Sequence, residues 1–253
     1  MYYKKQGKNQ AVVLLHGWNT NSKYMDFIFE ALKDEYCVVN VDLAGFGKSA
    51  IAYAYDLSDY AKELNDLILS LQLESPILVA HSFGARVAFE YALNYPCKAL
   101  FLTGAAGIKP PLTKKQKIKQ WFYKKIPWLK VKWGSKDYQE ANVIMKQVMV
   151  KCIQKDFTNY LNQIKIPVGL FWGSDDDQTP VWMAYQMLQL MPQATLRVVK
   201  GANHFAYLEH KALFLYDLHK FLKKGMKTSD CAINDFVVDS FKTSIDDVTT
   251  TTL

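Results

Sequence analysis

One short segment has the features of a serine nucleophile at a tight turn. Residues 80–84 read Ala-His-Ser-Phe-Gly, directly after the apolar run 76–80 and before a run of helical character, 85–95. Such a turn requires small residues two positions before and after the serine. Glycine meets that need fully and alanine nearly. The first N–H groups of the helix would point at the space above Ser82, where an oxyanion could form. The pattern favours a nucleophile over an ordinary serine in a strand-to-helix turn.

A serine hydroxyl is a weak nucleophile at neutral pH, so it needs a base, and His204 is the strongest candidate. It lies in the segment Gly-Ala-Asn-His-Phe, 201–205, after the last apolar run. The other histidines lie within motifs or on a predicted helix: His16, His81, His210 and His219. Three consecutive aspartates, 175–177, lie between Ser82 and His204, which gives the chain order Ser, Asp, His.

The elements that would position these residues alternate along the chain. Short Val-, Ile-, Leu- and Phe-rich runs are typical of parallel strands covered on both faces. They occupy residues 11–15, 36–41, 76–80, 99–103, 167–172 and 195–199. Helices are predicted over 56–71, where Asp56 and Asp59 can cap the first turn, and over about 208–224. This alternation predicts an α/β fold with a mostly parallel, doubly wound sheet.

These motifs together resemble the α/β-hydrolase family over nearly all of residues 10–224. His-Gly-Trp at 16–18 is similar to the family's oxyanion loop, and 42–49 is similar to its structural D-x-x-G-x-G-x-S loop. The resemblance implies that the N–H groups of Trp18 and Phe83 form the oxyanion hole. It also places the triad acid three residues after Gly173 with a proline four further on, which selects Asp176. Asp175 is the alternative acid.

A Ser82–His204–Asp176 triad implies a serine hydrolase that cleaves a small carboxylic ester or thioester and needs neither cofactor nor metal. Two other hypotheses remain open on the same fold. One is a carbon–carbon bond hydrolase or a synthase of the menaquinone-pathway type, which shares the Ser-Asp-His order. The other is a ligand-binding protein with little catalysis. Fold alone does not decide between them.

The domain organisation follows from where strands stop. We expect a hydrolase core over 1–107 and 165–225, a helical cap over 108–164, and an acidic, Thr-rich, flexible tail over 226–253. Within the cap, apolar residues recur at helical spacing from Tyr138 to Cys152.

Arg86, one helical turn after Ser82, could bind a substrate carboxylate, but structural support is the favoured role.

The net charge of +7 is concentrated in one segment. Residues 109–136 hold ten lysines and no acidic residue, so the rest of the chain sums to −3. This local concentration argues against a nucleic-acid partner. A solvated lysine face is the simplest interpretation, and a funnel for an anionic substrate or a contact with anionic lipid are alternatives. The segment's aromatics could line an acyl pocket or form the cap's own core: Trp121, Phe122, Tyr123, Trp128 and Trp133.

Amino-acid composition excludes several other classes of protein. Half of the 253 residues are hydrophobic and 22% are charged, which is globular composition and excludes a wholly disordered or collagen-like chain. No uncharged apolar run approaches the ~20 residues of a membrane span. The cysteines are scattered with no C-x-x-C pair: Cys37, Cys97, Cys152 and Cys231. We therefore expect reduced thiols in a cytoplasmic protein.

Overall fold

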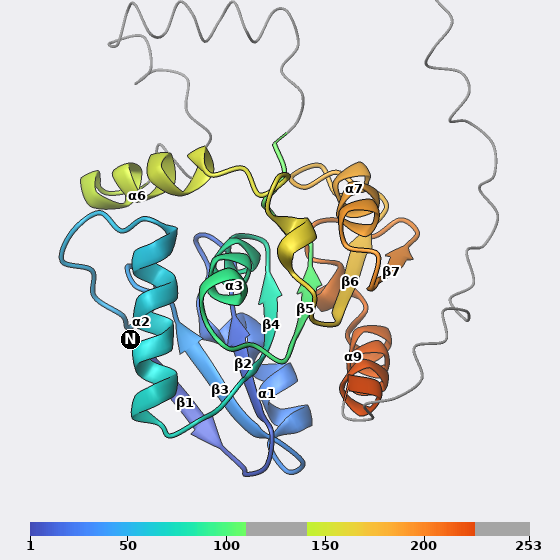
Figure 1. Ribbon diagram of the computed structural model, residues 1–253, viewed down its shortest axis with the longest axis horizontal. Coiled ribbons are helices and arrows are strands. Elements are labelled where there is room, and N and C mark those ends of the chain that lie inside the picture. The colour runs from blue at the N-terminus through green and yellow to red at the C-terminus, as the bar shows by residue number, and fades with distance from the viewer. Residues whose placement is uncertain (110–140, 226–253) are drawn as a thin grey trace, which may run out of the picture.

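The apolar runs pair into one sheet of seven strands. The computed structural model describes residues 1–109 and 141–225 (Figure 1). The strands lie in the order β1-β3-β2-β4-β5-β6-β7, with β1 antiparallel to β3 and every other pair parallel. Their bounds are β1 Tyr2–Gln6, β2 Ala11–Leu15, β3 Cys37–Asp42, β4 Ile77–His81, β5 Ala99–Thr103, β6 Val168–Gly173 and β7 Ala194–Val199. The predicted α/β class, with a mostly parallel doubly wound sheet, is confirmed.

Helices cover both faces of this sheet (Figure 1). On β2, Val13 and Leu15 join a core cluster with α2, α3 and α7, whereas Val12 and Leu14 join a second cluster with α1 and α9. Alternate side chains of one strand are therefore buried on opposite faces, as its continuous apolar sequence predicts. The α-helices are α1 Asp26–Leu32, α2 Leu57–Ser70, α3 Phe83–Asn94, α6 Val143–Gln154, α7 Trp182–Leu190, α8 Ala206–Glu209 and α9 Lys211–Gly225, and the short 3₁₀ helices are η1 Ser22–Met25 and η3 Leu161–Gln163.

The capping signal at Asp56 forms as predicted. Its carboxylate accepts the N–H groups of Ser58 (2.8 Å) and Asp59 (3.1 Å), and the Asp59 carboxylate accepts the N–H of Asp56 (2.9 Å). These bonds satisfy N–H groups that a first helical turn otherwise leaves unpaired. The apolar stripe of α2 then packs against the sheet through Leu57, Tyr60 and Leu64, among others.

Three elements differ from those assigned from the sequence. The segment Tyr2–Gln6, to which the sequence pattern assigns no element, forms the exposed edge strand β1. The segment Asp26–Leu32, also unassigned, forms α1. The predicted helix 208–224 is two helices, because His210 leaves helical geometry with ψ = +51°.

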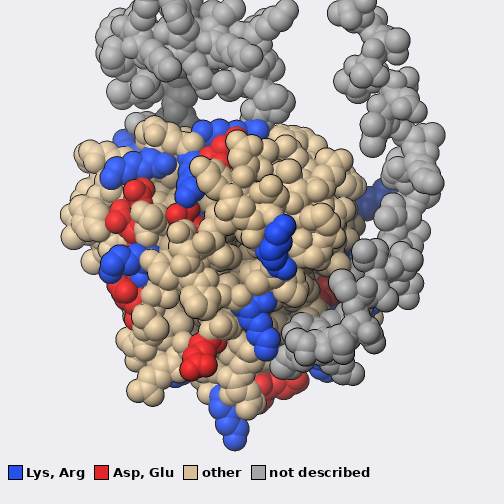
Figure 2. Space-filling model, in the orientation of Figure 1, with Lys and Arg blue, Asp and Glu red and all other residues tan. Residues whose placement is uncertain are grey.

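The chain between β5 and β6 is described in part. Its described part, residues 141–164, contains α6 and η3 and no strand, and the helical cap over 108–164 stays a prediction. Most of the lysine-rich segment 109–136, with its aromatics and Tyr138, lies outside the described residues, and so does the tail 226–253. In the described ranges no helix is long and apolar enough to cross a membrane. Figure 2 shows acidic and basic side chains interspersed on one face of those ranges.

Candidate active site

Ser82 lies in a strained turn between β4 and α3. Its backbone has φ = +50° and ψ = −110°, a conformation that residues other than glycine rarely adopt. The Ser82 N–H donates to the carbonyl of Thr103 (3.1 Å), and the Ser82 carbonyl accepts from Ala85 (3.0 Å) and Ala106 (3.2 Å). At Gly84 a Cβ would lie 2.6 Å from the carbonyl oxygens of Leu15 and His16, so only glycine fits. The small-residue spacing read from the sequence thus has a steric cause.

Ser82→Gly should therefore stabilise the fold while removing the hydroxyl. Relief of the strained φ gains about 1–3 kcal/mol, and the greater freedom of glycine in the unfolded chain offsets about 0.5–1 kcal/mol of it. We expect a net gain of roughly 1 kcal/mol, measured by urea unfolding against wild type. Ser70→Gly, on exposed α2 backbone, is the control and should lose stability. A loss at Ser82 as well would show that the turn is not strained.

Asp176 and His204 form a buried pair. Nδ1 of His204 lies 2.9 and 3.1 Å from the two carboxylate oxygens of Asp176, and each residue is only 4% exposed. The Asp176 carboxylate also accepts the N–H groups of Gln178 and Thr179 and the hydroxyl of Thr179. Because a carboxylate only accepts, Nδ1 of His204 carries the proton and Nε2 is left as the basic nitrogen. Burial by itself would raise the pKa of Asp176, but the bonds from His204 and Thr179 outweigh it and lower that pKa.

The structure pairs His204 with the middle aspartate of the three. Asp175 and Asp177 are exposed, and Asp175 accepts the hydroxyl of Ser174 at 2.6 Å instead. The loops that carry Asp176 and His204 meet at Gly173, where a Cβ would lie 2.1 Å from the carbonyl oxygen of Ala202. Gly173, from which the position of the triad acid is counted, is thus required to be glycine because the two loops touch there.

Gly104 connects the turn of Ser82 with the ring of His204. Thr103, whose carbonyl holds the Ser82 N–H, is followed by Gly104 at φ = +51°. A Cβ there would lie 3.1 Å from Nδ1 of His204. No hydrogen bond joins Ser82 Oγ to His204 in the described residues, a looser arrangement that is common where no substrate is bound. Sequence reasoning missed Gly104 and Thr179; a glycine at the end of β5 and a threonine three residues after Asp176 were the available signals.

His81 packs directly behind this base. Its Nε2 lies 3.2 Å from the carbonyl oxygen of His204, to which it can only donate, and the two imidazole rings are 4.8 Å apart. Burial, with a smaller contribution from His204, lowers the pKa of His81 to about 3. His81 therefore stays neutral and adds no positive charge beside His204.

The loop at 16–18 carries the second predicted oxyanion donor. A Cβ on Gly17 would lie 3.4 Å from Cβ of Ser82, so this backbone passes close to the serine. In the described residues no acceptor takes the N–H of Trp18 or of Phe83. The Trp18 ring packs edge-to-face on Phe83 (5.2 Å between ring centroids) and on Phe46 (5.0 Å). Both N–H groups are thus available near Ser82.

His16 holds this loop from inside. Its Nε2 accepts the N–H of Leu43 (3.0 Å), so Nδ1 carries the proton and donates to the carbonyl of Gly17 (2.8 Å). Burial lowers the pKa of His16 to about 4, against its ordinary value of 6.5. His16 is therefore a neutral structural residue rather than a second base.

This burial predicts an acid-labile fold. Between pH 6.5 and about 4 the unfolded chain binds a proton at His16 that the folded chain does not, so the free energy of unfolding falls as pH falls. His81 acts in the same direction. Each histidine contributes a slope of about 1.4 kcal/mol per pH unit. We expect His16→Gln to reduce the dependence of the free energy of unfolding on pH by about this amount. The measurement is urea unfolding at pH values from 6.0 to 4.5. Val13→Ala should lower stability and leave the slope intact; an unchanged slope in His16→Gln would contradict this origin.

The D-x-x-G-x-G-x-S loop has the structural role that the resemblance implies. The Asp42 carboxylate accepts the N–H groups of Ser22 (2.7 Å) and Lys48 (2.8 Å). A Cβ on Gly47, at φ = +55°, would lie 2.3 Å from that carboxylate. At Gly45 it would meet the sulfur of Met145 on α6 at 2.4 Å, so the loop also supports the helical insertion.

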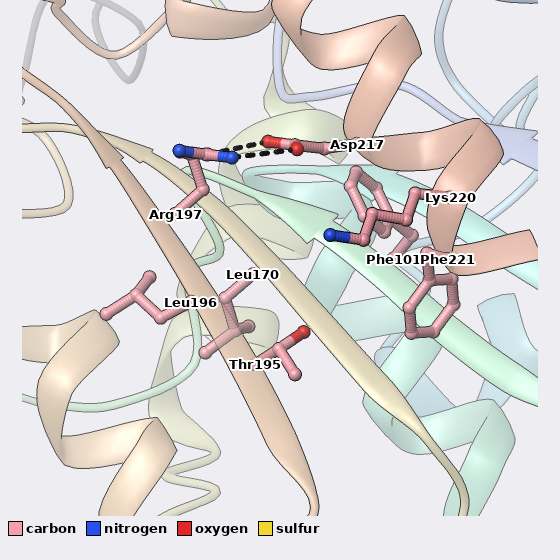
Figure 3. Close-up of a pocket in the computed structure, with 8 residues that line it drawn as sticks. All are labelled: Phe101, Leu170, Thr195, Leu196, Arg197, Asp217, Lys220 and Phe221. Carbon is pink, nitrogen blue, oxygen red and sulfur yellow. Dashed lines mark hydrogen bonds and ion pairs between the residues drawn. The ribbon is translucent and has the colours of Figure 1, made fainter. Parts of the chain in front are cut away.

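Two hollows differ in their relation to Ser82. The larger, about 440 Å³, lies between α3, the segment after β5, α6 and the loop before α7, and Thr179 lines it. The smaller, about 70 Å³, lies beside β7 and α9, where Arg197 and Asp217 are joined by two hydrogen bonds of 2.9 and 3.1 Å (Figure 3). Only the larger hollow adjoins the Asp176–His204 pair. In the described ranges no three His, Cys, Asp or Glu side chains converge as metal ligands would.

The family model described as alpha/beta hydrolase family matches residues 12–215. The chain belongs to this family. The expected α/β-hydrolase fold and enzyme class are thereby confirmed. Among curated relatives, it is 24% identical to a pimeloyl-[acyl-carrier protein] methyl ester esterase of Aliivibrio salmonicida, over 88% of this chain and 96% of that one. It is 27% identical to the non-heme chloroperoxidase CPO-A1 of Kitasatospora aureofaciens, over 88% and 96%.

Solved α/β-hydrolases superpose over most of the chain. An esterase from Exiguobacterium antarcticum has a TM-score of 0.71 at 23% identity and covers 88% of this chain and 95% of its own. MenH from S. aureus gives 0.68 at 22% identity, covering 89% and 99%. The meta-cleavage product hydrolase CumD from Pseudomonas fluorescens IP01 gives 0.70 at 17% identity, covering 88% and 93%. At these identities the likeness concerns the fold.

Proposed function

We propose that this α/β-hydrolase cleaves a small carboxylic ester or thioester through an acyl-enzyme on Ser82. The observation that carries the proposal is the strained Ser82 turn beside a buried Asp176–His204 pair whose Nε2 is free to accept a proton. The chemistry needs no cofactor or metal. The relatives named as esterases support the reaction class.

In the first step Nε2 of His204 takes the proton of Ser82 Oγ as the oxygen attacks the carbonyl carbon. The resulting oxyanion accepts the N–H groups of Trp18 and Phe83, and each such donor lowers the barrier by about 3–4 kcal/mol. Asp176 holds neutral His204 in the correct tautomer and orientation before the transfer and stabilises the imidazolium that forms.

In the second step His204 returns the proton to the leaving alcohol or thiol, and the carbon–oxygen or carbon–sulfur bond breaks. Water, deprotonated by the same nitrogen, then attacks the acyl-enzyme. Release of the carboxylic acid restores the Ser82 hydroxyl. The described cysteines, Cys37, Cys97 and Cys152, are unpaired, which supports a cytoplasmic location as part of this proposal.

The same geometry fits two alternatives. Carbon–carbon cleavage or a menaquinone-pathway-type synthase would use Ser82 and His204 to move a proton or to attack a ketone, and MenH and CumD share the fold. A ligand-binding protein would leave both residues idle.

A substrate panel on the purified full chain separates the three. We expect p-nitrophenyl butyrate and a butyryl thioester to be hydrolysed, and both activities to be lost in Ser82→Ala. Cleavage of a vinylogous diketone without ester turnover would favour the first alternative instead. Binding of the panel with no turnover at all would favour the second.

A further inference from the structure

The larger hollow contains an arginine that forms no ion pair with a described carboxylate. Arg86 lines it from α3 and is only 8% exposed. Its Nη1 donates to the carbonyl oxygens of Lys155 (2.9 Å) and Cys152 (3.3 Å) at the end of α6. The expected supporting role of Arg86 is therefore present in the structure.

That role uses one nitrogen of three. In the described residues nothing accepts from Nε or Nη2 of Arg86, and no carboxylate lies within 4 Å of it. Neither nitrogen is among the fully buried polar atoms without a partner, so both keep accessible surface. The chain's other arginine, Arg197, forms a two-bond ion pair with Asp217 (Figure 3). Arg86 thus differs from Arg197 in having two unused donors beside a cavity.

A buried guanidinium without a counter-ion is costly. Burial lowers the pKa of Arg86 and outweighs the smaller, opposite effect of the Asp156 carboxylate, so the surroundings work against the charge. An anion in the hollow would offset this cost, and the planar fork of an arginine matches the two oxygens of a carboxylate. Lys109, the other positive side chain lining the hollow, already donates to the carbonyl of Gln154, and Asp177 is the one acidic side chain among the described lining residues.

The hollow lies beside the turn that carries Ser82. Arg86 lies four residues after Ser82 on α3, about 6 Å further along the helix axis. Ala106, another lining residue, donates its N–H to the carbonyl of Ser82 (3.2 Å). Thr179, also lining, touches both Asp176 and His204. These contacts place the hollow next to the Ser82 turn and to the Asp176–His204 pair, at a distance that a short acyl chain on Ser82 would span.

We propose that Arg86 binds the distal carboxylate of the acyl group through Nε and Nη2. The substrates would then be half-esters or half-thioesters of short dicarboxylic acids. This inference rests on the proposed function, because it assumes that Ser82 hydrolyses an ester. In that reaction Arg86 does not contact the reacting atoms and acts as a specificity residue.

The test compares mono-p-nitrophenyl adipate with p-nitrophenyl hexanoate, which have the same chain length and differ in the terminal carboxylate. We expect wild type to favour the adipate ester in kcat/KM. Arg86→Gln should lower the adipate-to-hexanoate ratio at least tenfold, mainly through KM. Any general loss from disturbed α6 affects both esters and cancels in the ratio. Arg197→Gln, which lies outside this hollow, is the control and should keep the wild-type ratio. An Arg86→Gln ratio equal to that of wild type would overturn the proposal.

Binding to a Ser82→Ala background separates this proposal from failure of the proposed function. Calorimetry with monomethyl adipate and methyl hexanoate should show at least tenfold tighter binding of the adipate, reduced by Arg86→Lys, which loses the planar fork. If neither p-nitrophenyl ester is hydrolysed but the adipate still binds more tightly, the proposed ester hydrolysis is wrong and the proposed carboxylate site at Arg86 is supported. Equal binding of the two ligands would overturn the site, whatever the activity.

Discussion

Ser82→Ala and His204→Ala will each lower ester hydrolysis by about 10⁴-fold or more while the fold remains intact. Alanine at 82 removes the oxygen that forms the acyl-enzyme, and alanine at 204 removes the nitrogen that accepts its proton. Because the two residues act as one unit, the double variant should be little worse than either single one. The measurement is kcat/KM for p-nitrophenyl butyrate, with circular dichroism and a melting curve on each variant.

A serine far from the proposed site provides the control. Ser70 is exposed at the end of α2, and its hydroxyl bonds the carbonyl of Leu67 at 2.7 Å. Ser70→Ala should keep wild-type kcat/KM. A folded Ser82→Ala protein with near-normal turnover would refute Ser82 as the nucleophile.

Asp176→Asn will lower kcat by about 10³- to 10⁴-fold with little effect on KM. An amide nitrogen facing Nδ1 of His204 favours the wrong tautomer, which places the proton on Nε2 and removes the base. It also loses the negative charge that stabilises protonated His204. Steady-state kinetics on p-nitrophenyl butyrate, at a pH where wild type is fully active, provide the comparison.

The neighbouring aspartate is a matched control. Asp175→Asn makes the same chemical change one residue away, on an exposed side chain that bonds Ser174 rather than His204. It should leave kcat within about threefold of wild type, as surface changes usually do. If Asp175→Asn is the damaging change and Asp176→Asn is mild, Asp175 is the acid.

The sequence predicted the sheet because its central strands are continuous Val-, Ile-, Leu- and Phe-rich runs, a pattern set by burial on both faces. β2 and β5 match residue for residue, and the other four predicted strands are shifted by one residue at one or both ends. β1 could not be found this way, since all five of its residues are exposed and polar or tyrosine. An edge strand is formed by pairing with its neighbour, and no periodicity marks it.

The candidate site was accessible to sequence reasoning where chain order and spacing carry it. Ser82, Asp176 and His204 could be named because each follows a strand whose end lies at the same edge of the sheet. Gly104, Thr179 and the carbonyl contact of His81 arise between loops more than 20 residues apart. Only three-dimensional packing shows such contacts. The cap over 108–164 and the tail over 226–253 remain predictions, since residues 110–140 and the whole tail lie outside the described ranges.

The most direct test of the central claim is covalent labelling of the full chain with a fluorophosphonate. Attack by an activated serine forms an oxygen–phosphorus bond and expels fluoride, so the label reports the nucleophile independently of the natural substrate. We expect one adduct per chain by intact mass, located by peptide mapping to Ser82, absent in Ser82→Ala and strongly slowed in His204→Ala. Equal labelling of wild type and Ser82→Ala, or an adduct on another residue, would contradict the account.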